Sequence, residues 1–205
     1  MTAVTLDCEV LLRELRYLLR SRFWFCNVSP ICRRHQLRLR GIQTMLSSLS
    51  RASSVASSRA GVAWLGFCAA LALHITDEAL TGFLSVYNPT ILAFRPYGWW
   101  FPPTFEFRTW LTGLIVGVTI LSALAPFFFR GARWVRPLGY LLAVMIGILN
   151  ALGHITGTVL GHTLPSVRFA RPMPGFYSSP ILLAASLYLL LRLREAGRVA
   201  SRSRM

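Results

Sequence analysis

The sequence predicts an all-α fold, a polytopic four-helix transmembrane bundle with both termini in the cytoplasm. Composition indicates the membrane class: 54% of the residues are hydrophobic and 14% are charged, whereas a soluble domain carries about 25% charged residues. The arginines flank apolar segments instead of forming one basic face. The net charge of +15 therefore favours contact with the anionic lipid bilayer, and we expect no nucleic-acid partner.

Four segments are long enough to cross a bilayer, which takes about 20 apolar residues. They cover approximately residues 61–87, 110–129, 138–161 and 178–194. The last segment is the shortest, and it ends in arginines whose long side chains can reach the interface.

The distribution of arginine predicts the topology independently. Ten Arg precede residue 61, three lie in the second loop and five lie at the carboxyl end of the chain. With both termini in the cytoplasm, 18 Arg are inside and the four of the first and third loops are outside. The positive-inside rule predicts this asymmetry for a multi-pass protein of the cell membrane.

Residues 1–60 form a basic, Ser-rich arm in this interpretation, and residues 196–205 form a basic tail. The arm begins with "VLLRELRYLLRSRFWF" (10–25), an amphipathic pattern typical of a helix that lies on an anionic membrane. The low-complexity stretch "SSLSRASSVASSRAG" (47–61) predicts a linker. In the alternative, residues 1–44 are a spurious upstream extension, because a start at Met45 keeps every span.

The first loop is rich in aromatic residues and proline. Four aromatic side chains, those of Tyr97, Trp99, Trp100 and Trp110, predict a belt at the level of the lipid head groups. A re-entrant loop, or a loop that covers a substrate, is the alternative.

Two polar groups interrupt the apolar spans. In the first span, His74, Asp77 and Glu78 share one helical face, although each acid costs about 2.5 kcal/mol or more at mid-bilayer. In the third span, Asn150 and His154 are four residues apart and also share a face. The two spans run in the same direction, and the groups fall at the same depth. We therefore expect them to face each other.

Two further features of the third span bear on this site. Gly153, Gly157 and Gly161 form a ridge of small residues, which predicts close packing of the helices along it. His162 follows the span directly, so we expect its side chain to close the site from the outer edge.

Mixed imidazole and carboxylate ligands suit a divalent metal such as Zn, Fe or Mn. The candidate ligands are His74, Glu78, His154 and His162. Asp77 and Glu78 are the candidate catalytic carboxylates, Asp77 either as general base or as the partner of a ligand. The corresponding function is a hydrolase-like reaction, in which a metal-activated water attacks a lipid or lipid-like substrate. An oxidative metal centre is also compatible with these ligands.

Other functions fit the same residues. Acids inside a membrane commonly mark a proton or ion path, which would make the chain a small transporter or a channel subunit. A structural hydrogen-bonded network between helices is a third interpretation. Metal identity, substrate and oligomeric state do not follow from the sequence.

Three short motifs resemble those of the uncharacterised bacterial membrane proteins named for an HXXEE motif. His74 to Glu78 is similar to that motif with Asp77 in place of its first Glu, and Asn150-x-x-x-His154 is similar to a second signature. Before the last span, Pro174-Gly175 matches a Tyr-x-Pro-Gly element that here lacks its Tyr. The resemblance covers residues of about 65–190. It implies a membrane location and a shared polar site that includes Asn150, Pro174 and Gly175 as supporting residues.

Overall fold

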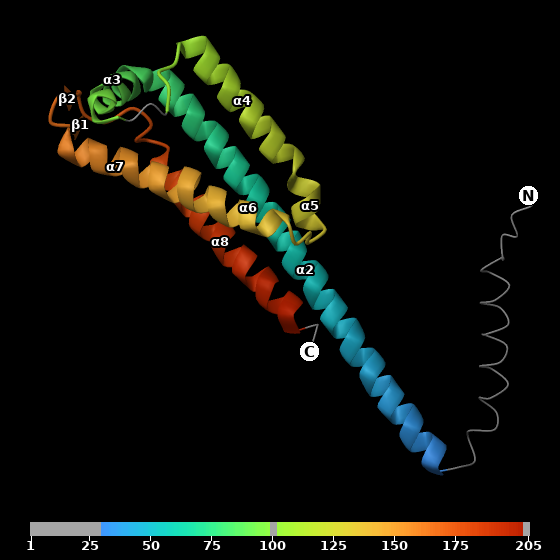
Figure 1. The fold of residues 1–205 in the computed structure, drawn as a ribbon. Coiled ribbons are helices and arrows are strands. Elements are labelled where there is room, and N and C mark those ends of the chain that lie inside the picture. Colours follow the sequence, from blue (N-terminus) through green and yellow to red (C-terminus); the bar gives the residue numbers. More distant parts are fainter. Residues whose placement is uncertain (1–29, 99–101, 203–205) are drawn as a thin grey trace, which may run out of the picture. The chain divides into compact units, whose positions relative to one another are not determined.

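The computed structural model describes residues 30–98 and 102–202 of the chain. The chain divides into two compact units, Met1–Ser50 and Arg51–Met205. The described residues of the first unit are helical, and the amphipathic helix predicted for residues 10–25 lies outside the described part of the chain. The second unit contains all the predicted spans and site residues (Figure 1).

The first long helix, α2 (Pro30–Thr81), runs through the segment in which the serine content predicts a linker. The serine side chains are accommodated within the helix, where hydroxyl groups donate to carbonyl oxygens about one turn earlier. Ser54 Oγ donates to Arg51 O at 2.9 Å, and Ser57 Oγ donates to Ser54 O at 3.0 Å. No Gly or Pro occurs between residues 42 and 60. The Ser-rich stretch is therefore part of one continuous helix, and the boundary between the two units falls within it.

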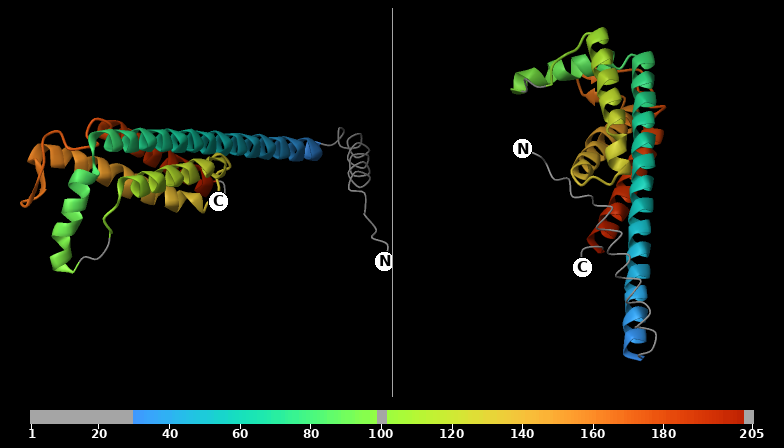
Figure 2. Two further views of the ribbon diagram at one scale, coloured as in Figure 1. Left: turned by 90° about the horizontal axis from the view of Figure 1, so that it is seen from above. Right: turned by 90° about the vertical axis from the view of Figure 1, so that its right-hand side faces the viewer.

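Helix α2 ends at Thr81 because Gly82 adopts the left-handed conformation, with φ of 75°. The next helix, α3 (Leu84–Phe94), leaves at a steep angle to α2 in both views of Figure 2, where it is green. A short 3-10 helix, η1 (Arg95–Tyr97), follows it. The span predicted at 61–87 is thus divided at Gly82, and its last residues belong to α3.

The second predicted span contains α4 (Phe107–Ala123) and α5 (Ala125–Phe129), which meet at Leu124. Proline occupies the first turn of α5, where its missing N–H costs least. Much of the apolar surface of α4 is uncovered: Ile115 is 56% exposed and Ile120 is 58% exposed. Such a surface suits contact with hydrocarbon.

The third predicted span is one continuous helical stretch. It consists of α6 (Val135–Leu142), the π-helical segment η2 (Ala143–Leu149) and α7 (Asn150–Leu160). It ends at Gly161, which has a φ of 76°. The π-helical turn directly precedes the site residues of α7, and such turns often occur at functional sites.

A two-stranded antiparallel hairpin follows, β1 (His162–Leu164) with β2 (Val167–Arg168). The side-chain hydroxyls of Thr90 in α3 and Thr163 in β1 lie 2.6 Å apart and join the hairpin to α3. The last helix, α8 (Ser179–Arg202), packs along η2 and α7.

Aromatic and aliphatic side chains from α2, α5 and α8 form the core of this unit. Trp64 stacks on Phe128, with ring centroids 4.0 Å apart, and its Nε1 donates to Leu121 O at 2.8 Å. Leu182 and Leu189 of α8 are fully buried against this cluster. The core packs α2 with α8, and Ser178, the residue directly before α8, contacts the site residues of α2.

Three stretches of the described helices are long and apolar enough to cross a membrane: Arg51–Thr81, Phe107–Phe129 and Val135–Leu160. The all-α prediction is confirmed. Helix α8 is not among the three, because charged residues interrupt its apolar sequence from Arg192 onwards.

The glycine ridge of the third span packs differently from the prediction. A Cβ atom at Gly153 would have no neighbour within 4 Å. Gly157 is buried against the Met173 side chain, in the segment before α8, and Gly161 ends the helix. The expectation that this ridge brings the first and third spans together is therefore wrong. It instead makes room for the segment that follows the hairpin.

Candidate metal centre

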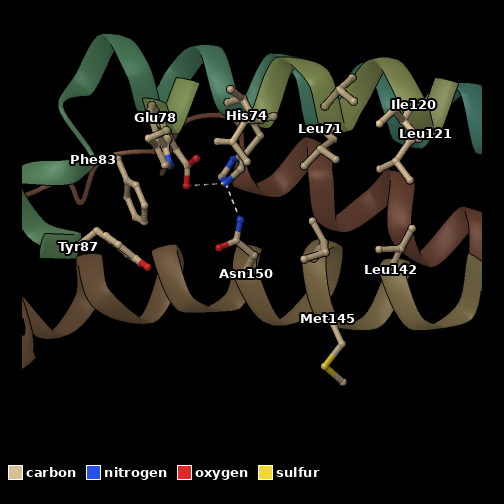
Figure 3. Close-up of a pocket in the computed structure, with 16 residues that line it drawn as sticks. Leu71, His74, Glu78, Phe83, Tyr87, Ile120, Leu121, Leu142, Met145 and Asn150 are labelled. Carbon is tan, nitrogen blue, oxygen red and sulfur yellow. Dashed lines mark hydrogen bonds and ion pairs between the residues drawn. The ribbon is translucent and has the colours of Figure 1, made fainter. Parts of the chain in front are cut away.

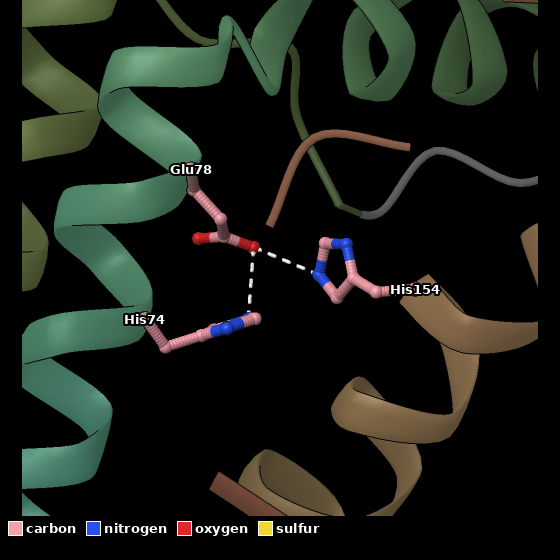
Figure 4. Close-up of side chains that lie close together, drawn as sticks. All are labelled: His74, Glu78 and His154. Carbon is pink, nitrogen blue, oxygen red and sulfur yellow. Dashed lines mark ion pairs between the residues drawn. The ribbon is translucent and has the colours of Figure 1, made fainter. Parts of the chain in front are cut away.

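Three side chains from two helices meet at one point inside the unit. His74 and Glu78 lie one turn apart on α2, and His154 lies on α7 (Figure 4). Glu78 Oε1 is 3.0 Å from His154 Nε2 and 3.4 Å from His74 Nε2. The three ligand atoms that these residues offer lie within 4.8 Å of one another. The predicted meeting of the two polar faces is confirmed for these residues.

This group is almost completely buried. The exposed fractions are 0% for His74, 5% for Glu78 and 2% for His154. A carboxylate removed from water is costly unless a positive charge and hydrogen bonds compensate it. Two imidazole nitrogens and one carboxylate oxygen of buried residues that lie this close together are a donor set that could hold a divalent metal ion.

The far nitrogen of the His74 ring is bonded to a serine that precedes α8. His74 Nδ1 lies 2.8 Å from Ser178 Oγ, and Ser178 Oγ donates to Asp77 Oδ2 at 2.8 Å. Because the serine hydroxyl donates its hydrogen bond to the carboxylate, the serine oxygen accepts a hydrogen bond from the N–H group at His74 Nδ1. Nε2 of His74 is then the nitrogen with the lone pair, which faces Asn150 Nδ2 at 3.0 Å and Glu78 Oε1 at 3.4 Å. A partner on the far nitrogen fixes the histidine tautomer in the same way in metal sites.

Asp77 therefore contacts Ser178 and is not a member of the ligand group. Its Oδ2 also accepts the backbone N–H of Ser178 at 2.8 Å, directly before α8. A negative charge is favourable there because the amino end of a helix carries unpaired N–H groups and the positive end of its dipole. This geometry favours a role for Asp77 in orienting His74 through Ser178 over the role of general base.

Of the two remaining histidine and asparagine residues predicted for the site, Asn150 lies beside the ligand group and His162 lies outside it. Asn150 Nδ2 is 3.0 Å from His74 Nε2, so Asn150 belongs to the site (Figure 3). His162 lies in β1, and its buried Nδ1 has no hydrogen-bond partner among the described residues. The ligand group found in the described chain comprises His74, Glu78 and His154 and does not include His162.

The Pro174–Gly175 turn lies directly on the ligands. A Cβ atom at Gly175 would be 2.8 Å from His154 Cε1 and 2.9 Å from Glu78 Cγ, closer than side chains pack. The Gly175 N–H donates to Thr81 Oγ1 at 3.1 Å, and its carbonyl accepts from Ser179 Oγ at 2.7 Å. Pro174 is buried beside it. The turn is thus fixed at both ends against the site.

The sequence pattern does not by itself indicate a role for Ser178 in the site. A serine before a predicted helix is typical of capping within that helix and does not predict a bond to another helix. The carboxylate of Asp77 within an apolar stretch was the better signal, because a carboxylate that is partly removed from water needs hydrogen-bond donors.

No protein-family model, curated protein or solved structure matches this chain. The resemblance to the HXXEE-motif family stays a prediction that rests on the three short motifs. The function must therefore be argued from the site.

An apolar cavity of about 600 Å³ adjoins the candidate ligands His74 and Glu78 (Figure 3). His74, Glu78 and Asn150 form its polar wall. Trp110 also lines it and is only 8% exposed, so this residue does not belong to an exposed aromatic belt. Tyr97 is 79% exposed, as the belt prediction requires, and Trp99 and Trp100 lie outside the described residues.

Proposed function

We propose that the chain is an integral protein of the cell membrane with four crossings and cytoplasmic termini. Three crossings are the stretches that have the required length and composition. The fourth is the apolar first half of α8, with the side chains of Arg192 and Arg194 extending to the interface. In this orientation α3 and the hairpin lie at the outer surface, and the arginine asymmetry of the sequence supports it.

We further propose that the site is a divalent metal centre with His74, Glu78 and His154 as ligands. The observation that carries this proposal is the position of Glu78 Oε1, within 3.4 Å of one imidazole nitrogen and 3.0 Å of another, in a buried place. A cation would stabilise such a group, because a buried carboxylate needs a compensating positive charge. Zn, Fe and Mn all accept this donor set.

The chemistry that such a centre supports best is hydrolysis. Three protein ligands leave a position for water, and a bound metal lowers the pKa of that water to about 7. Asp77 and Ser178 orient His74, and Asn150 offers an amide beside the ligand nitrogen. The protein is then a metal-dependent membrane enzyme of the hydrolase type.

Elemental analysis of the detergent-purified protein tests this function. We expect the wild type to bind one of the three metals stoichiometrically, and His74→Ala, Glu78→Ala and His154→Ala each to lose it. Each single change should cost nearly as much as all three together, since ligands of one ion act as a unit. His162→Ala is the matched control, because it is the same substitution outside the ligand group, and it should keep the metal. A wild type without metal after reconstitution with Zn, Fe and Mn would refute the proposal.

A further inference from the structure

The cavity beside the ligands has two parts of different character. Leu71, Leu121 and Leu142 line it on one side of the polar wall, and Phe83 and Tyr87 line it on the other (Figure 3). Its volume of about 600 Å³ lies within the range of small-molecule sites, about 300–1,000 Å³. The cavity is therefore large enough for a ligand and not only for solvent.

The cavity opens towards apolar surface. Two of its lining residues, Ile120 of α4 and Ile146 of η2, are 58% and 41% exposed. In the membrane this opening would face lipid hydrocarbon. A ligand that enters there must be soluble in the bilayer, because a water-soluble ligand would have to cross hydrocarbon first.

We propose that the cavity binds the hydrocarbon chain of a lipid-like amphiphile and places an oxygen of its head group at the metal. The leucine-lined part offers no hydrogen-bonding side chain, so it selects an alkyl or acyl chain. The polar wall of His74, Glu78 and Asn150 is where a carbonyl or ester oxygen finds a cation and an amide donor. This inference rests on the proposed metal centre and names the substrate class of that site.

Gly117 gives a way to fill the cavity without disturbing the ligands. It lines the cavity from α4, and a Cβ atom there would have no neighbour within 4 Å. Gly113 lies one turn earlier on the same helix, also has open space around it, and is not part of the cavity wall. Gly117→Leu and Gly113→Leu therefore form a matched pair with the same gain in helix propensity.

Photolabelling of the full chain in nanodiscs with a diazirine-bearing monoacylglycerol tests the proposal. We expect saturable labelling of cavity residues such as Leu71 and Leu142, suppressed by unlabelled monoacylglycerol. Gly117→Leu should reduce this labelling about tenfold or more, because losing the burial of two methylene groups already has that effect. Gly113→Leu should label like the wild type. Both variants should keep their metal.

Two results would overturn the proposal in separate ways. Labelling that is spread over the outer surface of the helices and equal in the two glycine variants would mean that bulk lipid alone contacts this face. Saturable cavity labelling that does not weaken when the metal is removed with a chelator would refute the placement of the head group at the metal. Elemental analysis of the same samples shows whether the metal centre itself has failed, independently of either result.

Discussion

The ring nitrogen Nδ1 of His74 lies 2.8 Å from the hydroxyl oxygen of Ser178, although 104 residues separate them in the sequence. Both side chains are buried. The bond connects α2 with the start of α8, and it directs the other nitrogen of the same ring at Glu78. The position of α8 and the chemistry of the ligand group are thus coupled through one serine.

Removing the Ser178 hydroxyl should weaken metal binding without removing a ligand. We expect Ser178→Ala to raise the metal Kd about 10- to 100-fold, the usual cost of losing the partner of a ligating histidine. Competition with a chromophoric chelator measures this Kd. Ser186→Ala is the control: Ser186 is a buried serine within α8 that donates to Leu182 O, away from the site. Equal Kd values for the two variants would show that Ser178 does not orient His74.

Asp77 should contribute mainly to stability and to the position of α8. In Asp77→Asn the side-chain oxygen can still accept from Ser178, whereas the charge beside the helix terminus is lost. We expect this variant to keep its metal and to lose about 0.5–2 kcal/mol of unfolding free energy. Asp77→Ala leaves the Ser178 donors without an acceptor and should lose more. Thermal unfolding in detergent with elemental analysis checks both. An Asp77→Asn protein of unchanged stability but abolished hydrolysis would instead identify Asp77 as the base.

Helical periodicity and matched depth predicted that His74, Glu78, Asn150 and His154 meet, but they did not predict that Asp77 and His162 lie outside the ligand group. His74 with Glu78, and Asn150 with His154, are each four residues apart, so each pair shares a helical face, and their similar depth in parallel spans brought the faces together. Figure 3 shows α2 and the helix of Asn150 running in the same direction past the cavity. Local sequence spacing carries this information because the α-helix has a fixed geometry.

The parts that were not predicted depend on contacts between distant segments. Gly82 ends α2, yet a single glycine within an apolar stretch does not by itself predict a break. The Ser-rich residues before Gly61 are helical, although serine has a lower helix propensity than alanine and its low-complexity pattern is typical of linkers. The roles of Ser178 and Gly175 follow only from where α8 packs, which no local pattern specifies.

The topology predicts opposite sides for the first loop and the carboxyl terminus. With 18 arginines inside and four outside, a reporter after Tyr97 should be periplasmic and one after Met205 cytoplasmic. Paired alkaline phosphatase and fluorescent protein fusions measure both positions. Two reporters on the same side would mean that α8 does not cross the membrane with the other three stretches.

Gly175 gives a test of how closely the site is packed. Its φ of 84° is unfavourable for any other residue by about 1–2 kcal/mol, and an added Cβ would also press on His154 and Glu78. Gly98 has almost the same φ, 82°, but open space around it. Gly98→Ala therefore reports the backbone strain alone, and Gly175→Ala adds the displacement of two proposed metal ligands. We expect Gly175→Ala to be the less stable variant and to bind metal at least about tenfold more weakly, as for other small ligand displacements. If the two variants bind metal equally well, the turn at Gly175 does not shape the ligand group.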